Sequence, residues 1–200
     1  EWVNRPIPQS DWITRPVILW APTWNEDLNR RDEVLAILIE QAEAQKAHVI
    51  VRVHPATEWR EPEFMATLRR QKGFSIDDTL TGPWYALQKA SVLVTDLSGI
   101  GLLALAVGDA DLPVIQVEKQ GWHTASHAQI DQQGPEWVFR NDLGCRVFSG
   151  QQLSDYLDRI AWQKKDEFQR QRQAVRDQLL GQIEGSCDRL VTKLEELFYG

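Results

Sequence analysis

The chain has 200 residues, of which 42% are hydrophobic and 26% are charged, and its formal net charge is −7. A chain of this length can bury the core of one domain. Its acidic balance gives no support to general nucleic-acid binding, so we expect no nucleic-acid partner. No apolar run approaches the roughly 20 residues that a membrane-spanning helix needs.

The domain organisation can be predicted from composition along the chain. Residues 1–16 are rich in proline and are expected to form a lead-in or linker. Residues 17–150 are predicted to form an α/β domain, and residues 151–200 to form C-terminal helices that pack on it. The chain begins at Glu1 with no signal peptide and no initiator methionine, so we interpret it as a domain cut from a longer protein or as a trimmed form.

Short apolar segments predict the strands. The run Val-Ile-Leu-Trp-Ala at residues 17–21 is continuous, which is typical of a strand that is buried on both faces. Comparable segments bounded by loops predict further strands at residues 48–53, 74–76, 91–95, 112–117 and 145–148.

Helical patterns lie between these strands. The apolar residues from 29 to 45 follow helical spacing. Residues 61–71 and 83–90 each have a proline that suits a first helical turn, and residues 99–107 are expected to form an apolar helix. The sequence beyond residue 149 predicts one long charged helix or a pair of helices up to residue 180, and then a final helix at 184–198.

The alternation of strands and helices predicts an α/β fold, Rossmann-like, in which a mainly parallel sheet is the middle of three layers. Ligands of such sheets bind beyond the carboxyl ends of the strands. His54, residues 95–99 and Glu118 each follow a predicted strand, so they could all face one crevice.

The joint between strand and helix at residues 92–107 is the most informative local signal. An apolar strand is followed by the polar turn Thr-Asp-Leu-Ser-Gly and then by an apolar helix. The first amide groups of a helix have no intrahelical partner, and together with the helix dipole they attract anions, phosphate above all. Ser98 can cap this helix and present its hydroxyl to a phosphate, and Gly99 lets a ligand approach the backbone. Thr95 supplies a further hydroxyl, whereas Asp96 is expected to orient the backbone, bind an acceptor hydroxyl or cap the helix.

His54 is the candidate catalytic residue. Its imidazole could hold a diphosphate oxygen or assist a leaving phosphate, or it could cap the end of the strand by hydrogen bonding to the backbone. Arg52 alternates with His54 and would point the same way on a pleated strand, although a surface ion pair is an alternative. Glu118 could accept hydrogen bonds from a ribose diol or could be an exposed charge at a strand end.

Other constellations have less support. His123, His127 and Asp131 have the spacing of metal ligands on a helix, but this segment has little helical character, so we favour a loop that covers the ligand and predict no metal site. The sequence contains no GxGxxG, GxxxxGK[ST] or GxSxG motif, which removes support for an ordinary dinucleotide, P-loop or serine hydrolase site. The wide separation of Cys145 and Cys187 favours a reduced, cytoplasmic setting.

The number of tryptophans, nine, is high for a chain of this length. Several of them fall in or near predicted connections, where their rings either pack at the rim of the core or cover a cleft or a missing partner domain. These are Trp12, Trp20, Trp24, Trp59, Trp84 and Trp122.

Four segments, taken in order, resemble the carboxyl-terminal half of the CDP-glycerol glycerophosphotransferases, the teichoic-acid and capsule polymerases of bacteria. In that family the corresponding segments look like APT followed by Phe or Trp, His-Pro, and TDYSS followed by Ile or Leu. The resemblance covers residues 17–118, and residues 184–190 look like the helix that ends the family's second domain. The matching segments here are ILWAPTW at 18–24, VRVHP at 51–55, ASVLVTDLSGI at 90–100 and LPVI at 112–115.

The resemblance implies the second, donor-binding half of a GT-B type transferase, which is built of two Rossmann-like domains. The family's His-Pro histidine maps onto His54, which implies contact with the donor diphosphate, and its serine-rich phosphate loop maps onto Ser98 and Gly99. Thr23, in the APT motif, is a further candidate donor-binding residue. Gly99 replaces the usual second serine and Leu97 the usual aromatic residue, so one hydroxyl is missing and the donor need not be CDP-glycerol.

The resemblance also implies the partners. These are a nucleotide-linked donor such as CDP-glycerol, a polymer or lipid-linked acceptor, and the family's first domain, with no metal and no cofactor. It implies a cytoplasmic protein that is peripheral at the inner face of the bacterial plasma membrane. The family's other important histidine belongs to the first domain, so we expect this chain to bind donor at best and not to turn over alone.

Three hypotheses for the function follow. The leading one is the donor-binding half of a transferase that moves glycerophosphate or a sugar from a nucleotide-activated donor to a cell-surface polymer or lipid-linked acceptor. The first alternative is a GT-B enzyme that resembles the sugar-nucleotide 2-epimerases. The second is a non-catalytic α/β protein-interaction module, in which Trp24, Trp59 and Trp122 would form an exposed apolar patch without a concave pocket.

Overall fold

A six-stranded sheet forms the centre of the molecule. The computed structural model describes residues 15–24, 29–78, 82–107, 111–119, 133–162 and 166–181. The strand order is β3-β2-β1-β4-β5-β6, and every neighbouring pair is parallel, which confirms the predicted α/β class. The strands are β1 (Val17–Ala21), β2 (His48–Val51), β3 (Phe74–Ile76), β4 (Val92–Thr95), β5 (Val114–Val117) and β6 (Cys145–Val147).

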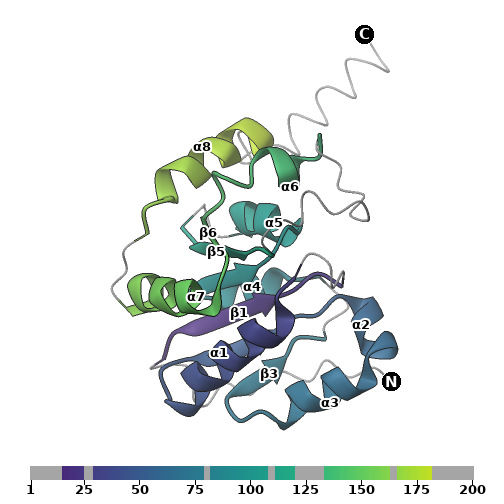
Figure 1. Cartoon of the computed structure of the whole chain (residues 1–200). Helices are drawn as coiled ribbons and strands as arrows, with labels where there is room; N and C mark the ends of the chain where they lie inside the picture. The colour runs from purple at the N-terminus through teal and green to yellow at the C-terminus, as the bar shows by residue number, and fades with distance from the viewer. Residues whose placement is uncertain are drawn as a thin grey trace.

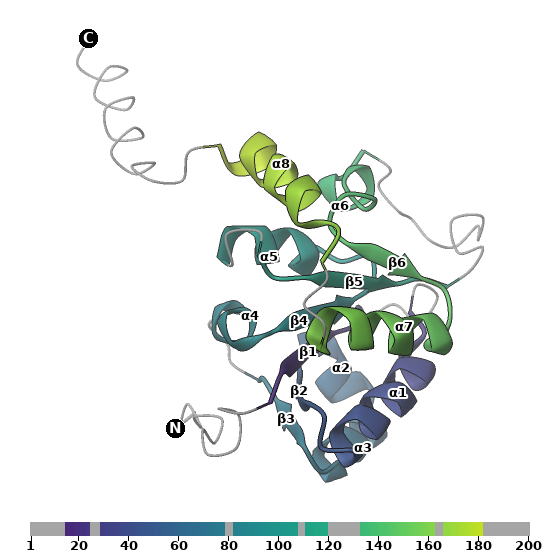
Figure 2. The ribbon, with the colours of Figure 1, turned by 90° about the vertical axis from the view of Figure 1, so that its left-hand side faces the viewer.

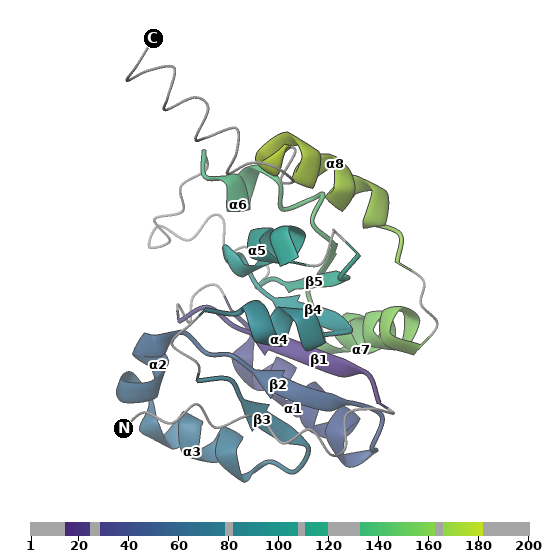
Figure 3. The same cartoon turned by 180° about the vertical axis from the view of Figure 1, so that it is seen from behind.

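Helices cover both faces of this sheet and complete a three-layer fold (Figure 1, Figure 2). The helices are α1 (Arg31–Glu43), α2 (Pro55–Arg60), α3 (Pro62–Arg70), α4 (Trp84–Lys89), α5 (Ile100–Val107), α6 (Pro135–Val138), α7 (Gly150–Leu157) and α8 (Gln169–Leu180), with a short π-helix at Asp158–Trp162. Side chains of α1, α3 and α7 share one hydrophobic core with the sheet. The core on the other face is built from α4 and α5, which lie in front of the sheet in the view from behind (Figure 3).

β1 is buried on both faces, as its continuous apolar run predicts. Ile18 and Trp20 belong to the core beneath α1, α3 and α7, whereas Leu19 and Ala21 belong to the core beneath α4 and α5. Ile18 and Leu19 are both 0% exposed. Full burial of one such side chain contributes roughly 1.5–3 kcal/mol, so packing on two sides fixes β1 at the centre of the sheet.

The chain order of the strands reverses at β1. After β1 the chain adds β2 and β3 toward one edge, and it then returns to the other side of β1 to add β4, β5 and β6. The helix after β1 packs on one face and the helix after β4 packs on the other. Such a reversal leaves a crevice beyond the carboxyl ends of the two central strands, where open α/β sheets bind ligands.

The predicted strand at residues 48–53 is too long at its carboxyl end. β2 ends at Val51, and His54 is the N-cap of α2, a helix that the sequence analysis missed. Pro55 occupies the first position of α2. Proline is tolerated there, since that amide has no intrahelical acceptor and the ring fixes a helical φ.

The charged segment beyond residue 149 forms two helices, α7 and α8, so the alternative of one long helix was wrong. The amide of Phe168, the N-cap of α8, donates to Asp166 Oδ1 at 3.0 Å. Asp166 also pairs with Arg172, which is fully buried (0% exposed). A buried guanidinium requires a charged partner, and this pairing favours a turn at the start of α8. The predicted helix at 184–198 lies outside the described residues.

In the part of the chain that the structure describes, the helices are all too short or too polar to cross a bilayer.

Candidate functional site

The carboxyl ends of β1 and β4 are joined by side chains of β4 and of the turn that follows it. The hydroxyl of Thr95 donates to the carbonyl oxygen of Ala21 at 2.8 Å. The amide of Thr23 donates to Asp96 Oδ2, also at 2.8 Å. These two bonds hold the loop after β1 against the turn after β4.

The backbone of Thr23 is held from a second side by Asn29. The side-chain amide of Asn29 donates to the carbonyl oxygen of Thr23 at 3.0 Å, and its Oδ1 accepts from the amide of Arg31 at 3.2 Å. Asn29 therefore satisfies one of the unpaired amides at the start of α1 while it holds the loop. The helical pattern that begins near Asn29 predicts its place before α1, but its contact with the Thr23 loop was not predicted.

Asp96 is a buried carboxyl group without full compensation. It is 3% exposed, and Oδ1 is buried with no hydrogen-bond partner. Burial raises the pKa of Asp96 from 3.8 to about 7, although the amide hydrogen bond from Thr23 opposes this rise. Three roles were left open for Asp96, and the geometry agrees with the one in which it orients the backbone. Its Oδ2 accepts from the Thr23 amide and so holds the loop after β1.

A hollow of about 220 Å³ opens at this joint. It gathers Thr23 from the loop after β1, Arg52 and His54 from the segment after β2, and Ser98 from the turn before α5. Pro83, Ile100 and Leu103 supply apolar wall, and sequence analysis did not single them out. Four of the predicted donor-site residues, from three separate loops, therefore meet in one concavity.

His54 both caps a helix and lines the hollow. Its Nδ1 accepts a hydrogen bond from the amide of Ala56 at 3.1 Å. His54 therefore bonds to the backbone, as the alternative role required, but it caps the start of α2 and not the end of β2. The two roles are compatible, because acceptance at Nδ1 places the proton of the neutral ring on Nε2. Nε2–H is then a hydrogen-bond donor with a fixed orientation.

Arg52 lies in the wall of the hollow with its guanidinium anchored. Nη1 donates to Asp77 Oδ2 at 2.7 Å, and the side chain of Asp77 is 0% exposed. The ion pair that was considered for Arg52 is therefore present. It fixes the side chain at a position that lines the hollow even though β2 has already ended at Val51.

The turn before α5 has the geometry of a helix start. The carbonyl oxygens of Ser98 and Gly99 accept from Gly101 and Leu102, both at 3.1 Å. A Cβ built on Gly99 would meet Glu136 Oε1 at 3.2 Å, so this carboxylate lies close to the predicted phosphate turn. Glu136 is on α6, a short helix that the sequence analysis also missed.

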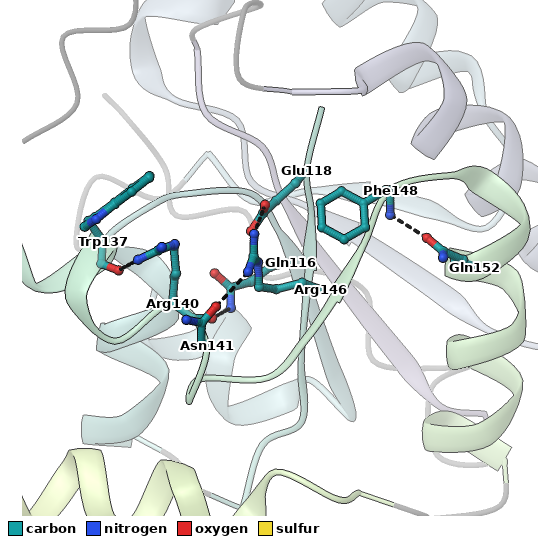
Figure 4. Close-up of polar contacts among 8 residues, drawn as sticks. All are labelled: Gln116, Glu118, Trp137, Arg140, Asn141, Arg146, Phe148 and Gln152. Atoms are coloured by element: carbon teal, nitrogen blue, oxygen red, sulfur yellow. Dashed lines mark hydrogen bonds and ion pairs between the residues drawn. The ribbon is translucent and has the colours of Figure 1, made fainter. Parts of the chain in front are cut away.

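Glu118 lies apart from this hollow and is paired with Arg146 (Figure 4). Its two carboxylate oxygens accept from Nε and Nη2 of Arg146 at 2.5 and 2.6 Å, and its side chain is 3% exposed. Hydrogen bonding to Glu118 raises the pKa of the Arg146 guanidinium above its ordinary value. Ribose binding by Glu118 stays a prediction, and a ribose would have to compete with this bidentate ion pair.

A larger hollow, of about 390 Å³, lies beside the first turn of α1 and contains none of the predicted donor-site residues. Its two arginines already pair with carboxylates, Arg30 with Glu33 and Arg31 with Glu61. We therefore place the candidate site at the smaller hollow, where residues from separate strands converge.

The described residues contain no cluster of three or more His, Cys, Asp or Glu side chains that could hold a metal ion. The weighed constellation of His123, His127 and Asp131 lies outside those residues. Cys145 is buried, and burial raises the pKa of its thiol to about 12, so it is not an activated nucleophile.

Comparison with known proteins gives matches among solved structures alone. No family model matches the chain, and no curated protein matches it. The wall teichoic acid polymerase TagF, solved after a soak with CDPG, has a TM-score of 0.52 and 17% identity over 92% of this chain. The calicheamicin glycosyltransferase CalG4 has a TM-score of 0.54 and 18% identity over 96%. The UDP-GlcNAc 2-epimerase of Methanocaldococcus jannaschii, solved with UDP-GlcNAc and UDP, has a TM-score of 0.51 and 16% identity over 80%.

These likenesses show the fold. The chain shares the architecture of one part of the glycosyltransferases and of the epimerase, in agreement with the predicted half of a GT-B fold. In each of these three structures the match covers 44% of the other chain, so this chain spans less than half of their length.

Proposed function

We propose that this chain is the nucleotide-donor-binding half of a GT-B type transferase. The observation that carries the proposal is the hollow at the β1–β4 joint, which brings His54, Arg52, Thr23 and Ser98 together at the start of α5. The transferred group is glycerophosphate or a sugar, and the acceptor is a cell-surface polymer or a lipid-linked acceptor.

In this proposal the donor diphosphate lies at the start of α5. Amide groups at a helix start and the hydroxyl of Ser98 bind its oxygens, and no metal is needed to balance its charge. His54 Nε2–H donates to the phosphate that departs with the nucleotide, since the cap at Nδ1 leaves that proton on the other nitrogen. Asp96 does not line this hollow, so its carboxyl acts through the Thr23 loop.

Two rival functions make different demands on the same surface. The protein-interaction hypothesis requires Trp24, Trp59 and Trp122 to be exposed without a concave pocket. Trp24 and Trp59 are 49% and 69% exposed, and Trp122 lies outside the described residues. They lie on the segments that border the hollow, however, which favours a ligand site. An epimerase-like enzyme would use the same half-fold with a UDP-sugar, so ligand identity separates it from a glycerophosphotransferase.

The test is a thermal-shift and calorimetric screen of the chain against CDP, CMP, UDP, GDP, CDP-glycerol and UDP-GlcNAc, with and without EDTA. A ligand that binds only the folded state stabilises it by about 2.7 kcal/mol when the ligand concentration is 100 times the Kd, and the melting temperature rises as a result. We expect one nucleotide to stabilise the chain regardless of EDTA, and we expect His54→Ala and Ser98→Ala to abolish that shift.

The matched controls are His48→Gln and Ser91→Ala. His48 bonds to Ser75 at 3.0 Å, and Ser91 accepts from the amide of Val17, so both lie at the amino ends of the strands. They should change the melting temperature of the free protein but not the shift caused by the nucleotide. Loss of the shift in the controls as well, or binding that EDTA abolishes, would contradict the proposed site.

A further inference from the structure

An exposed cluster of two tryptophans and an arginine lies next to the candidate site. We call it the Trp–Arg–Trp cluster, and it consists of Trp24, Arg60 and Trp59. The guanidinium carbon of Arg60 lies 5.4 Å from the ring centroid of Trp24 and 4.9 Å from that of Trp59. The tryptophans are 49% and 69% exposed. Exposed indoles of this size are uncommon on a surface that has nothing to bind.

The two carboxylates that flank Arg60 in the chain, Glu58 and Glu61, are paired with other arginines. Glu58 pairs with Arg69 at 2.6 Å, and Glu61 pairs with Arg31. Within the described ranges, Arg60 makes no ion pair and contacts the faces of two indoles instead. A guanidinium that has no carboxylate partner retains N–H donors that can bind a phosphate through two bonds.

The cluster is continuous with the hollow through Trp24. The ring centroids of Trp24 and His54 are 6.4 Å apart with the planes inclined at 50°. His54 lines the hollow, so pairwise contacts connect the hollow to the cluster in the order imidazole, indole, guanidinium, indole. A chain that leaves the hollow past Trp24 would therefore lie against the Trp–Arg–Trp cluster.

We propose that the Trp–Arg–Trp cluster is the acceptor subsite, and that it binds a polyol or saccharide chain that carries phosphate. A phosphate of the acceptor binds the edge of Arg60, and the carbon skeleton packs on the open indole surface of Trp59. The free end of the acceptor then extends past Trp24 toward His54. This inference rests on the proposed function, which assigns the diphosphate of the donor to the start of α5 and leaves Arg60 for a second anion.

The test measures binding of the chain to a short poly(glycerol phosphate) oligomer, to an uncharged maltohexaose and to inorganic phosphate. The indole N–H resonances of Trp24 and Trp59, assigned with Trp→Phe variants, report the site directly. We expect the oligomer to shift both resonances, and we expect Arg60→Met to weaken its binding about tenfold, the loss of one charge-assisted contact. Trp59→Ala should weaken it severalfold.

Arg69→Met is the matched control, since it removes an exposed arginine that already has a carboxylate partner. It should leave oligomer binding unchanged. Equal binding of maltohexaose, unchanged binding in Arg60→Met, or no shift of either indole would overturn the proposal, and in the last case the cluster is a surface for another protein domain. Titration of the same variants with the nucleotide found in the screen separates the two proposals. Arg60→Met should keep nucleotide affinity, whereas a wild-type chain that binds the oligomer but no nucleotide would contradict the donor site alone.

Discussion

The buried carboxyl of Asp96 should make the stability of the protein depend on pH near neutrality. Its pKa is raised from 3.8 to about 7 because burial penalises the charged form more than hydrogen bonds from backbone amides stabilise it. A carboxyl group whose pKa is higher in the folded state than in the unfolded chain contributes its full stabilisation below the unfolded pKa. This contribution is lost progressively as the pH rises from the unfolded pKa of 3.8 to the folded pKa of about 7. The full effect of a shift of this size is about 4 kcal/mol.

The perturbation is Asp96→Asn. The asparagine retains an oxygen that can accept from the Thr23 amide, and it carries no charge at any pH. It also places amide donors where Oδ1 lacks a partner, which costs roughly 1–3 kcal/mol whatever the pH. The informative quantity is therefore the change with pH of the stability difference between the wild type and the variant.

Between pH 5 and pH 8, the wild type should lose roughly 2.5 kcal/mol of unfolding free energy relative to Asp96→Asn. Urea denaturation at both pH values measures this change. Asp78→Asn, which removes an exposed carboxylate, is the control and should show no such change. The reasoning is refuted if the difference between the wild type and Asp96→Asn is the same at both pH values, because Asp96 would then be solvated or paired as a carboxylate.

Three further predictions concern other parts of the molecule. Gly99→Ser should tighten binding of a nucleoside diphosphate about fivefold in calorimetry, because it adds a hydroxyl to the turn. The turn can accept the side chain, since φ at Gly99 is not left-handed and the atom nearest to the new Cβ is the flexible end of Glu136. Unchanged or weaker binding would argue against a phosphate at this turn. Arg146→Met should destabilise the fold by about 3–5 kcal/mol because it removes the bidentate cationic partner of the buried Glu118 carboxylate. The double variant with Glu118→Gln should recover most of that loss in a urea double-mutant cycle. Leu38→Ala, at a position that is 0% exposed in the core beneath α1, should cost about 2–5 kcal/mol in the same assay, and a cost below 1 kcal/mol would mean that the α1 face is not packed as described.

Strands and the fold class could be predicted well because their signals are local. Strands of a parallel sheet are buried on both faces and read as short apolar runs, and each predicted strand is present, within a few residues of its predicted bounds. The joint of β4 and α5 was also found, because a polar turn between an apolar strand and an apolar helix is a local pattern.

The short helices α2 and α6 escaped prediction because they depend on caps and contacts and not on periodicity, whereas α4, also short, was predicted at residues 83–90. α2 has six residues, fewer than two turns, and its start is set by His54 and Pro55. The break between α7 and α8 is likewise associated with one buried ion pair of Asp166 and Arg172, which no helical pattern reveals.

The sequence by itself determined the layers of the fold and the segments that could carry a ligand site, because hydrophobic spacing and turn residues act within a few positions. Only the tertiary structure decided what each polar side chain does, because the partner of each lies far away in the chain. Asp96 accepts a hydrogen bond from Thr23, which lies 73 residues earlier in the chain, so its carboxyl holds the loop after β1. Glu118 forms an ion pair with Arg146, which lies 28 residues later. Among the described residues, Arg60 contacts two indoles and no carboxylate, because Glu58 and Glu61 beside it pair with arginines of other helices.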